Sequence, residues 1–588
     1  MNDHAPALLD GRHRGEIALA EETHERGPHA ASAAPAPPPP SIDANDDGSP
    51  PPSEAAVAPP TPGFLLVPVP RAAGYVFTAL VLALAQGFGQ SVVSANLQQL
   101  QGSFGATQAE TTWLTAAYLA PNASLSLALI KIRTQYGLRN FAELAILAFL
   151  GAAVLNYAAA DLSSNLVVRF VSGCAAAPMT TLAFLYMLEP LHAQRKMTVG
   201  LSLALTLIFM GSPLTRLVSP HLLDVGLWHG LTALEVALAM VGLGCIYLFP
   251  LASPPRENVI HAADIVSFFL IAIGFGCATV ALILGPVYWW LDAPWIGCLL
   301  VVAVAALAIA VVIELNRDHP LIDVRWLASP SVLHFTAALL LFRIVLSEQT
   351  SGAPGLFRAF GLANEQTRDL NAIILAATVA GGIACAIWMK QGRERIFHVI
   401  ALLLIIIGAL MDANATSQTA PRQLFLSQAL LGFASALFMP PALLSGLMSA
   451  LAKGRDYILS FVIVFLVTQK LGGTLGSAIF SSFVKVRQAL HFERLGEAMR
   501  LTDPAVVERL ALLGGAYRPA IADSAMLEAN AVRVLSGQAN LEATVLAYND
   551  AFLVVAAISA TALLALLAHI AIDWLRAHRA PPAAQPTA

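Results

Sequence analysis

The ionisable side chains that could do chemistry in this sequence lie inside long apolar stretches, where a charge is costly. The cations are Arg169, Arg343 and Lys470, and the acids are Glu235 and Glu348. A carboxyl group in an apolar site can bind and release a proton, whereas a buried cation attracts an anion. We interpret the two acids as candidate proton-binding groups. Arg343 and Lys470 are candidate contacts for an anionic or neutral amphipathic substrate.

Each of these charges also has a purely structural interpretation. Arg343 and Lys470 can pair with backbone carbonyls or with an acid on a neighbouring helix, and Arg169 can hydrogen-bond to helix carbonyls. Arg343 and Glu348 are separated by roughly 140° around a helix, so we do not expect them to pair within one helix. Because cations outnumber acids, the sequence favours an anionic or neutral ligand over a lipophilic cation.

Three glutamines extend this set of polar side chains in apolar surroundings. Gln86 and Gln90 are four residues apart in the sequence and therefore share a helix face. Gln469 directly precedes Lys470, and it either contacts a substrate or hydrogen-bonds between helices. We interpret all three glutamines as candidate residues of a central cavity.

The sequence contains none of the patterns on which common enzymatic chemistry depends. It has no phosphate-binding loop, no Ser/His/Asp arrangement and no metal-ligand spacing. We therefore expect no enzymatic activity, no cofactor, no metal and no direct use of ATP. The net charge of −4 does not indicate a nucleic-acid partner. The five cysteines lie in apolar stretches and are interpreted as small core residues: Cys174, Cys245, Cys277, Cys298 and Cys385.

The elements that must position these side chains are apolar stretches of roughly 20 residues, each long enough to cross a bilayer core of about 30 Å. About fourteen such stretches alternate with short charged loops. Of all residues, 57% are hydrophobic and 12% are charged, against about 25% charged in soluble domains. The sequence indicates an all-α polytopic membrane protein embedded in a lipid bilayer. The stretches begin near Ala73, Thr111, Phe141, Leu166, Thr198, His229, Asp264, Trp295, Ser331, Leu370, Ile396, Gln423, Tyr457 and Ala551.

The charges of the loops predict the orientation. Loops after even-numbered stretches carry thirteen Lys and Arg residues, against three in the short loops after odd-numbered stretches. Positive charge accumulates on the cytoplasmic side of a membrane. We therefore expect both termini in the cytoplasm and the protein in a bacterial-type inner membrane.

Three segments lie outside the apolar stretches. Residues 1–70 are rich in Ala, Pro and Ser and are interpreted as a disordered cytoplasmic tail. Residues 578–588 form a second short tail. Residues 484–547 are polar, and the even count places them outside the cytoplasm. They form either a folded helical cap or a loosely packed hairpin.

Several motifs resemble those of a known transporter family. Residues 169–176, Arg-Phe-Val-Ser-Gly-Cys-Ala-Ala, resemble the RxxQGxGA motif of the major facilitator superfamily. Residues 314–323, which begin with Glu and end with Pro-Leu-Ile-Asp, resemble the loop of an extra two-helix insert in the 14-span drug:proton antiporters. Residues 469–478 resemble the RQxGGxxGxA motif of that family. The resemblance covers the chain from about Ala72 to its end.

This resemblance implies a major facilitator fold with 14 transmembrane helices. It places six-helix bundles at residues 71–250 and 331–577, with the insert and its loop at 251–330. The implied function is proton-driven efflux of small amphipathic toxic compounds or drugs, with Arg169 beside the first span in proton coupling. Segment 484–547 suits docking to a periplasmic adaptor, as in tripartite pumps that continue through an outer-membrane channel.

Glycines in these motifs predict close helix contacts. Gly472 and Gly476 are one turn apart, so two helix backbones can approach closely on that face. Gly473 lies between them, and Gly173 belongs to the motif that Arg169 opens. We interpret these glycines as conformational positions, either fixed packing contacts or contacts that move.

Other motifs depart from the family pattern. The loop after the second span keeps Gly137 and Arg139 but lacks the gating Asp, and the fifth-span antiporter motif is reduced to Gly211 and Pro213. Gln90 stands where relatives often carry an Asp. Two alternatives therefore stay open: a sensor or scaffold that has lost its coupling motifs, and a narrow-substrate uptake transporter.

The predicted topology can be tested with reporter fusions. A reporter that is active only in the periplasm should give a signal when fused near Arg509 and none when fused after Arg576, because the two sites are expected on opposite sides of the membrane. Cells carrying each fusion at matched expression would be compared. The reverse pattern would contradict the orientation.

Overall fold

The computed structural model describes residues 65–579, except for 227, 253–255, 257–258, 318–319 and 455. The expected N-terminal tail at 1–70 and the C-terminal tail at 578–588 lie almost wholly outside the described residues. The described residues form helices joined by loops, with one isolated bridge between Leu65 and Leu191.

The first half of the chain contains six long helices. By length and apolar composition, 12 helices of the described chain could cross a membrane. Helices α3 and α17 are also long but are less apolar. The order of the long helices follows the predicted stretches. The helices of the first half are α1 (Val69–Ala95), α3 (Gln108–Tyr136), α4 (Leu138–Ala158), α5 (Leu162–Leu188), α7 (Leu201–Gly226) and α8 (Trp228–Leu248), with the short α2 (Leu97–Phe104) and α6 (Ala193–Arg195) between them.

The second half contains a broken helix at its start. Here α12 (Pro330–Val345) is followed by a π-helical turn at Glu348–Gly352 and by α13 (Ala353–Ala359). A π turn inside a helix frequently marks a functional position. The remaining elements are α14 (Arg368–Trp388), α15 (Glu394–Asp412), α16 (Phe425–Lys453), α17 (Asp456–Ala498), α18 (Pro504–Tyr517) and α19 (Ser524–Arg579).

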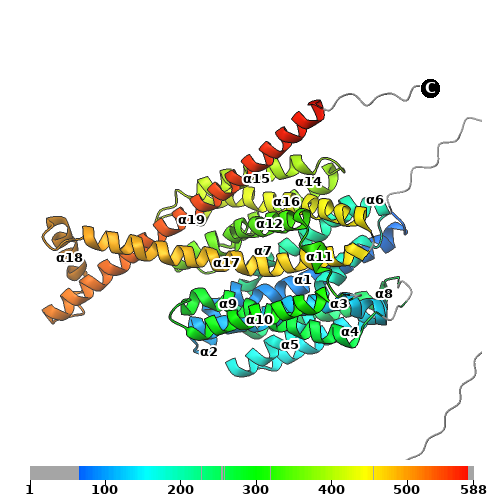
Figure 1. The fold of residues 1–588 in the computed structure, drawn as a ribbon. Coiled ribbons are helices and arrows are strands. Elements are labelled where there is room, and N and C mark those ends of the chain that lie inside the picture. Colours follow the sequence, from blue (N-terminus) through cyan, green and yellow to red (C-terminus); the bar gives the residue numbers. More distant parts are fainter. Residues whose placement is uncertain are drawn as a thin grey trace, which may run out of the picture. The chain divides into compact units, whose positions relative to one another are not determined.

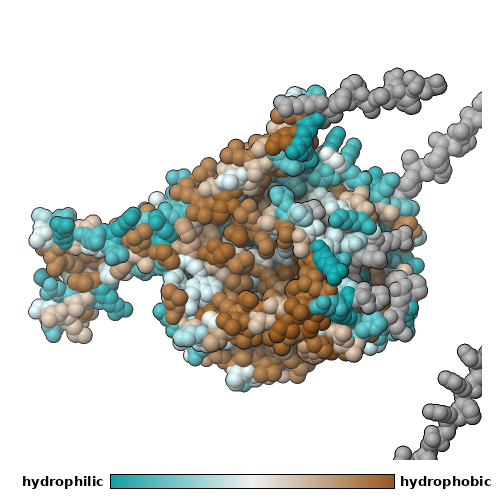
Figure 2. All heavy atoms as spheres, viewed as in Figure 1, coloured by the Kyte–Doolittle hydropathy of each residue, from teal (hydrophilic) through white to brown (hydrophobic). Residues whose placement is uncertain are grey.

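Segment 484–547, for which the sequence left two possibilities, is largely helical. Helix α17 continues for 43 residues and α19 for 56 residues, so both extend past the bundle to the short α18 (Figure 1). The bundle surface is mainly apolar in the same view, while this extension carries more hydrophilic residues (Figure 2). An apolar surface around the bundle is what contact with lipid requires.

The two-helix insert consists of α9 (Ala262–Tyr288) and α10 (Pro294–Leu315), and it joins the two halves. Helix α9 packs against both α3 of the first half and α17 of the second half. Near its end, the Trp113 indole on α3 donates a hydrogen bond to the Tyr288 hydroxyl at 3.2 Å. The Trp290 indole donates to the Ser482 hydroxyl on α17 at 2.8 Å. The insert is therefore fixed to both halves at this end.

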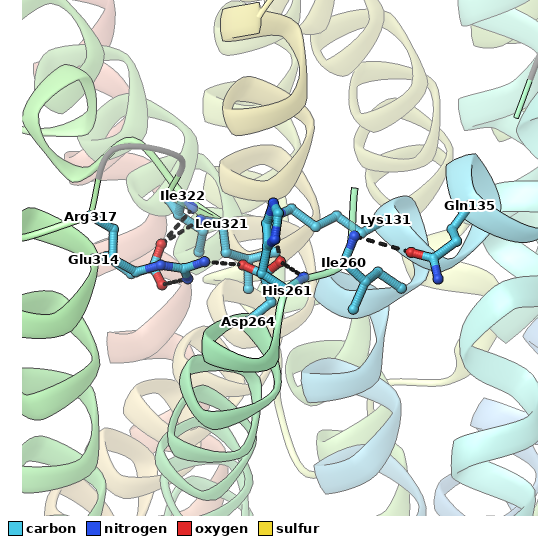
Figure 3. Close-up of polar contacts among 9 residues, drawn as sticks. All are labelled: Lys131, Gln135, Ile260, His261, Asp264, Glu314, Arg317, Leu321 and Ile322. Carbon is cyan, nitrogen blue, oxygen red and sulfur yellow. Dashed lines mark hydrogen bonds and ion pairs between the residues drawn. The ribbon is translucent and has the colours of Figure 1, made fainter. Parts of the chain in front are cut away.

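A cluster of charges fixes the opposite end of the insert (Figure 3). The Asp264 carboxylate on α9 accepts from Lys131 of α3 at 2.8 Å and from Arg317 at 2.6 Å. Glu314 accepts from Arg317 at 2.9 Å and from the backbone N–H of Leu321 at 2.5 Å. Burial lowers the pKa of Arg317, but hydrogen bonds and charge from Asp264 and Glu314 outweigh it and raise the pKa overall. Glu314, at the start of segment 314–323, therefore holds the following loop against the end of α10.

We predict that Asp264→Ala lowers the thermal stability of the purified protein. The substitution leaves Lys131 and Arg317, whose side chains are only 12% and 13% exposed, without their shared carboxylate. Loss of one partner from a buried ion pair costs about 3 kcal/mol or more. Thermal unfolding in detergent measures the effect.

Glu143→Ala is the matched control, because it removes the carboxylate of an ion pair whose arginine, Arg139, is 61% exposed. An exposed pair of this kind contributes little to stability. Equal melting temperatures for the Asp264→Ala variant and the wild type would contradict a structural role for the cluster.

Candidate functional site

A cavity of about 1180 Å³ lies between the two halves. All five residues that the sequence singled out for a cavity line it: Gln86, Gln90, Arg343, Gln469 and Lys470. Helix α9 of the insert contributes part of the wall, with Thr279, Leu282, Ile283, Pro286 and Val287. The volume exceeds the roughly 300–1,000 Å³ of typical ligand pockets, so a small amphipathic molecule fits with water beside it.

The cavity lies toward the end of the bundle that carries α18. On α17 its lining runs from Phe465 to Gln488, the part of the helix that leads to α18. Toward the other end, α7 and α14 pack closely. There the Ser202 hydroxyl lies 3.5 Å from the Cys385 sulfur, and a side chain at Gly382 would meet Thr206. The two halves are therefore in contact at the end of the bundle opposite α18, which closes the cavity there.

The described lining residues carry positive charge and no carboxylate. The cations of the lining are Arg216, Arg343, Arg358, Lys470 and Lys485. An uncompensated positive surface with apolar walls raises the local concentration of anions. Sequence reasoning identified Arg343 and Lys470 but not Arg216, Arg358 or Lys485, because these lie near the ends of their apolar stretches or in the segment interpreted as a connection.

Arg343 lies where α12 crosses the glycines of α17. A side chain on Gly472 would meet the aliphatic part of Arg343, and one on Gly473 would meet its guanidinium. The buried Nε of Arg343 has no hydrogen-bond partner among the described residues. The small residues of α17 thus make room for a guanidinium that borders the cavity and has donors available.

Lys470 uses its donors between the two halves. Its ammonium group on α17 donates to the Asn122 side-chain oxygen at 2.6 Å, the Asn122 carbonyl at 2.9 Å and the Ser126 hydroxyl at 2.7 Å. An ammonium group has three N–H donors, and three acceptors are present. Lys470 therefore joins α17 to α3 through neutral oxygen atoms, one of which is a backbone carbonyl.

The glutamines of the cavity have partners of different kinds. Gln86 donates to the side-chain oxygen of Gln90 at 2.7 Å, as expected for two side chains on one helix face. Gln469 lies 3.4 Å from the sulfur of Met439 on α16, so its amide contacts a neighbouring helix. All three amides still border the cavity and can hydrogen-bond to a ligand.

The first half contains a buried cluster around Gly89 of α1. Arg169 donates to the Gly89 carbonyl at 2.6 Å, and its guanidinium lies 4.4 Å from the centre of the Tyr118 ring. The Glu235 carboxylate of α8 accepts from Asn156 at 3.0 Å and approaches Gly89 so closely that a side chain added at Gly89 would have to displace it. Arg169 thus lies beside the first span, where the family resemblance places it. Neither Arg169 nor Glu235 is among the described residues of the cavity wall.

The second half contains a cluster that sequence reasoning found only in part. The Gln428 amide of α16 donates to Glu348 at 2.8 Å and to Asp412 of α15 at 2.7 Å. Asp412 and Gln428 were missed because each lies near the end of its apolar stretch, where a polar residue usually faces water. In the structure both are buried.

The comparisons with known proteins concern the fold. No protein-family model matches the chain. No curated protein matches it either. Two structures of POT family transporters, one with a thioalcohol-conjugated peptide and one with 5-aminolevulinic acid, are each 15% identical and cover 71% of this chain and 90% of theirs, with TM-scores of 0.52 and 0.51. The human organic anion transporter MFSD10 is 14% identical over 84% of this chain and 100% of its own, with a TM-score of 0.48.

The chain has the major facilitator fold. The glycines of the predicted motifs lie at close helix crossings. Gly173 meets the Tyr118 backbone, and Gly211 meets Gly87 on α1. Pro213, two residues further along α7 than Gly211, lines the cavity.

The remnant of the loop motif after the second span is also placed. Gly137 has a φ of +86°, a conformation that favours glycine, and begins α4 beside Arg256. Arg139 pairs with Glu143 one turn later at 2.9 Å on the surface. These two residues therefore shape the entry of α4 rather than the cavity wall.

We predict that Gly476→Ala destabilises the major facilitator fold. The added methyl group would lie 2.8 Å from the Arg343 carbonyl oxygen and 2.9 Å from the Ile344 Cα, so α17 must move away from α12. Overpacking of this kind costs about 1–3 kcal/mol. Thermal unfolding of the purified variant measures it.

Gly496→Ala on the same helix is the control. Nothing lies within 4 Å of the added methyl group there, so the helix should gain up to about 1 kcal/mol from the better helix former. A Gly476→Ala variant as stable as the Gly496→Ala variant would show that the crossing of α12 and α17 is not tight.

Proposed function

We propose that this protein is an inner-membrane secondary transporter that exports small anionic or neutral aromatic amphipathic compounds in exchange for protons. The single observation that carries the proposal is the cavity between the halves, whose described lining has five cations and no carboxylate. A lipophilic cation would be repelled there. An organic acid would find both charge complementarity and apolar walls.

The geometry suits alternating access. Two bundles that rock about a central site expose it to one side and then to the other. The cavity extends toward α18, and α7 and α14 close the opposite end. With both termini in the cytoplasm, this arrangement is the state that faces outward, from which an exported compound is released.

The residues of the sequence favour a proton gradient over ATP as the energy source. It has no phosphate-binding loop for ATP, while buried carboxyl groups are present in both halves. Protonation of such groups can couple a gradient to the rocking of the bundles. The protons and the small-molecule substrate are then the two transported species.

The extension formed by α17, α18 and α19 supports a partner outside the membrane. Its exposed side chains include the apolar Val507 and Leu512 of α18. We assign to this extension the docking of a periplasmic adaptor that leads to an outer-membrane channel. An export path through both membranes would then begin at the cavity.

Inside-out membrane vesicles test the function. Vesicles that contain the protein should accumulate a fluorescent organic acid when a proton gradient is applied. An ionophore that collapses the gradient should abolish accumulation, and ATP in de-energised vesicles should not restore it. Accumulation driven by ATP alone, or preference for a lipophilic cation, would contradict the proposal.

The same vesicles test Arg343 as a substrate contact. Arg343→Ala should weaken the apparent affinity for the acid about tenfold or more, since a hydrogen bond to a charged group contributes about 1.5–3 kcal/mol. Arg343→Lys should keep part of it, because the charge remains but the planar fork is lost.

Arg422→Ala, which removes an exposed arginine outside the cavity, is the control and should transport normally. Protein levels in the membrane would be compared by immunoblot. Normal transport by Arg343→Ala, or its absence from the membrane, would make Arg343 a structural residue.

A further inference from the structure

Two carboxyl groups of the second half share one amide in the protein interior. Glu348 lies in the π-helical turn between α12 and α13, Asp412 ends α15, and Gln428 lies in the first turn of α16. The Gln428 side-chain nitrogen is 2.8 Å from Glu348 Oε1 and 2.7 Å from Asp412 Oδ2. The exposed fractions of the three residues are 0%, 1% and 0%. The start of the second half and two later, consecutive helices thus converge on one polar cluster.

The cluster has more acceptors than donors. The side-chain NH2 group of Gln428 has two N–H donors, and both are used. The backbone N–H of Ala353 adds a long contact to Glu348 at 3.4 Å. The second oxygen of each carboxyl group, Glu348 Oε2 and Asp412 Oδ1, is buried without a described hydrogen-bond partner. A proton on one carboxyl group would remove one negative charge and supply a missing donor.

No ion pair among the described residues includes Glu348 or Asp412. The elements around the pair carry other charged or titratable groups, among them Tyr548 and Asp550 of α19, Arg358 of α13 and Arg343 of α12, whose guanidinium lies against Gly473 and borders the cavity. The Tyr548 hydroxyl lies against Gly355, and Asp550 pairs with Arg487 and His491 at 2.6 and 2.7 Å. Arg358 donates to the Pro354 carbonyl and faces the cavity. Two like charges in one buried site cannot both persist, so at least one carboxyl group is neutral.

The acid of the first half has a different environment. Glu235 and Arg169 lie around the same residues, Gly89 and Tyr118, so a cation accompanies the carboxylate. A neighbouring positive charge favours the ionised form of an acid. The buried acids of the two halves therefore differ in the compensation of their charge. Glu235 has a cation nearby, whereas the described residues place none in contact with Glu348 and Asp412.

The pair also lies directly behind the cavity wall. Gln349 and Ser351, which belong to the same π-helical turn as Glu348, line the cavity. Phe552 of α19 packs against Gly352 at the end of the same turn. A change in the charge of Glu348 therefore acts on the segment that joins α12 to α13 and that borders the substrate.

We propose that Glu348 and Asp412, bridged by Gln428, form a single proton-binding site that holds the coupling proton of the transport cycle. The proposal rests on the function proposed above and deepens it by locating the second transported species. The site takes up a proton from the side on which the cavity is open and gives it up on the other side after the halves have rocked. Glu235, which lies near the Arg169 guanidinium in the first half, is not part of this site.

Infrared spectroscopy of the full-length protein in lipid nanodiscs tests the site without transport. The wild type should show absorption from a protonated carboxyl group at neutral pH. The double variant Glu348→Gln/Asp412→Asn should lack this band, because amides of the same shape replace both acids and the fold is retained. Glu235→Gln and the exposed Glu365→Gln should keep it. A band that survives in the double variant, or disappears in Glu235→Gln, would overturn the assignment.

A transport measurement separates this inference from the proposed function. In vesicles, Glu348→Gln and Asp412→Asn should lose at least tenfold of the gradient-driven accumulation while substrate exchange across the membrane without a gradient continues. If the wild type shows the infrared band of a protonated carboxyl group but no proton-driven export, the proposed function is wrong and the proton-binding site remains supported. If the double variant exports as well as the wild type, the assignment of the proton-binding site is wrong and the proposed function remains supported.

Discussion

An ionised side chain inside an apolar helical bundle must be compensated by the protein itself, and much of this structure follows from how each charge meets that requirement. Lys470 is surrounded by neutral oxygen atoms of the opposite half. Arg169 uses a helix carbonyl and an aromatic face. Asp264 instead gathers two cations where the insert meets the first half. In each case the partner comes from a distant part of the chain, so compensation of charge also determines which helices are neighbours.

The two buried acid clusters occupy comparable places in their halves. In the first half the cluster joins the first, third and fourth long helices through Gly89, Asn156 and Arg169, and in the second half the same positions in the helix order carry Glu348, Asp412 and Gln428. The fourth helix contributes a cation in one half and a neutral amide in the other. The residue types at the three matched places all differ, and the acid of the first half, Glu235, comes from its sixth long helix instead. The two halves therefore have different electrostatic properties, although their helices follow the same order.

The sequence predicted the helical fold well because apolar stretches long enough for a bilayer have few alternatives. It also selected side chains that border the cavity, such as Gln90 and Arg343, since a polar residue deep in an apolar stretch needs a polar surface. It did not identify Asp412, which lies at the end of such a stretch, because the burial of a side chain at a helix end depends on how far the neighbouring helices extend. The partner of Lys470 could not be predicted from the sequence either. Asn122 lies far from Lys470 in the sequence, and only the packing of α17 against α3 brings the two residues together.

Helices α17 and α19 leave the bundle without a break, and this continuity makes them a mechanical lever. Residues 524–536 of α19, which precede its first cavity-lining residue, Gly537, span about 20 Å at a rise of about 1.5 Å per residue. A tilt of the second half by about 10° would move the far end of such an arm by about 3 Å. Small rotations near the cavity would therefore be magnified at α18.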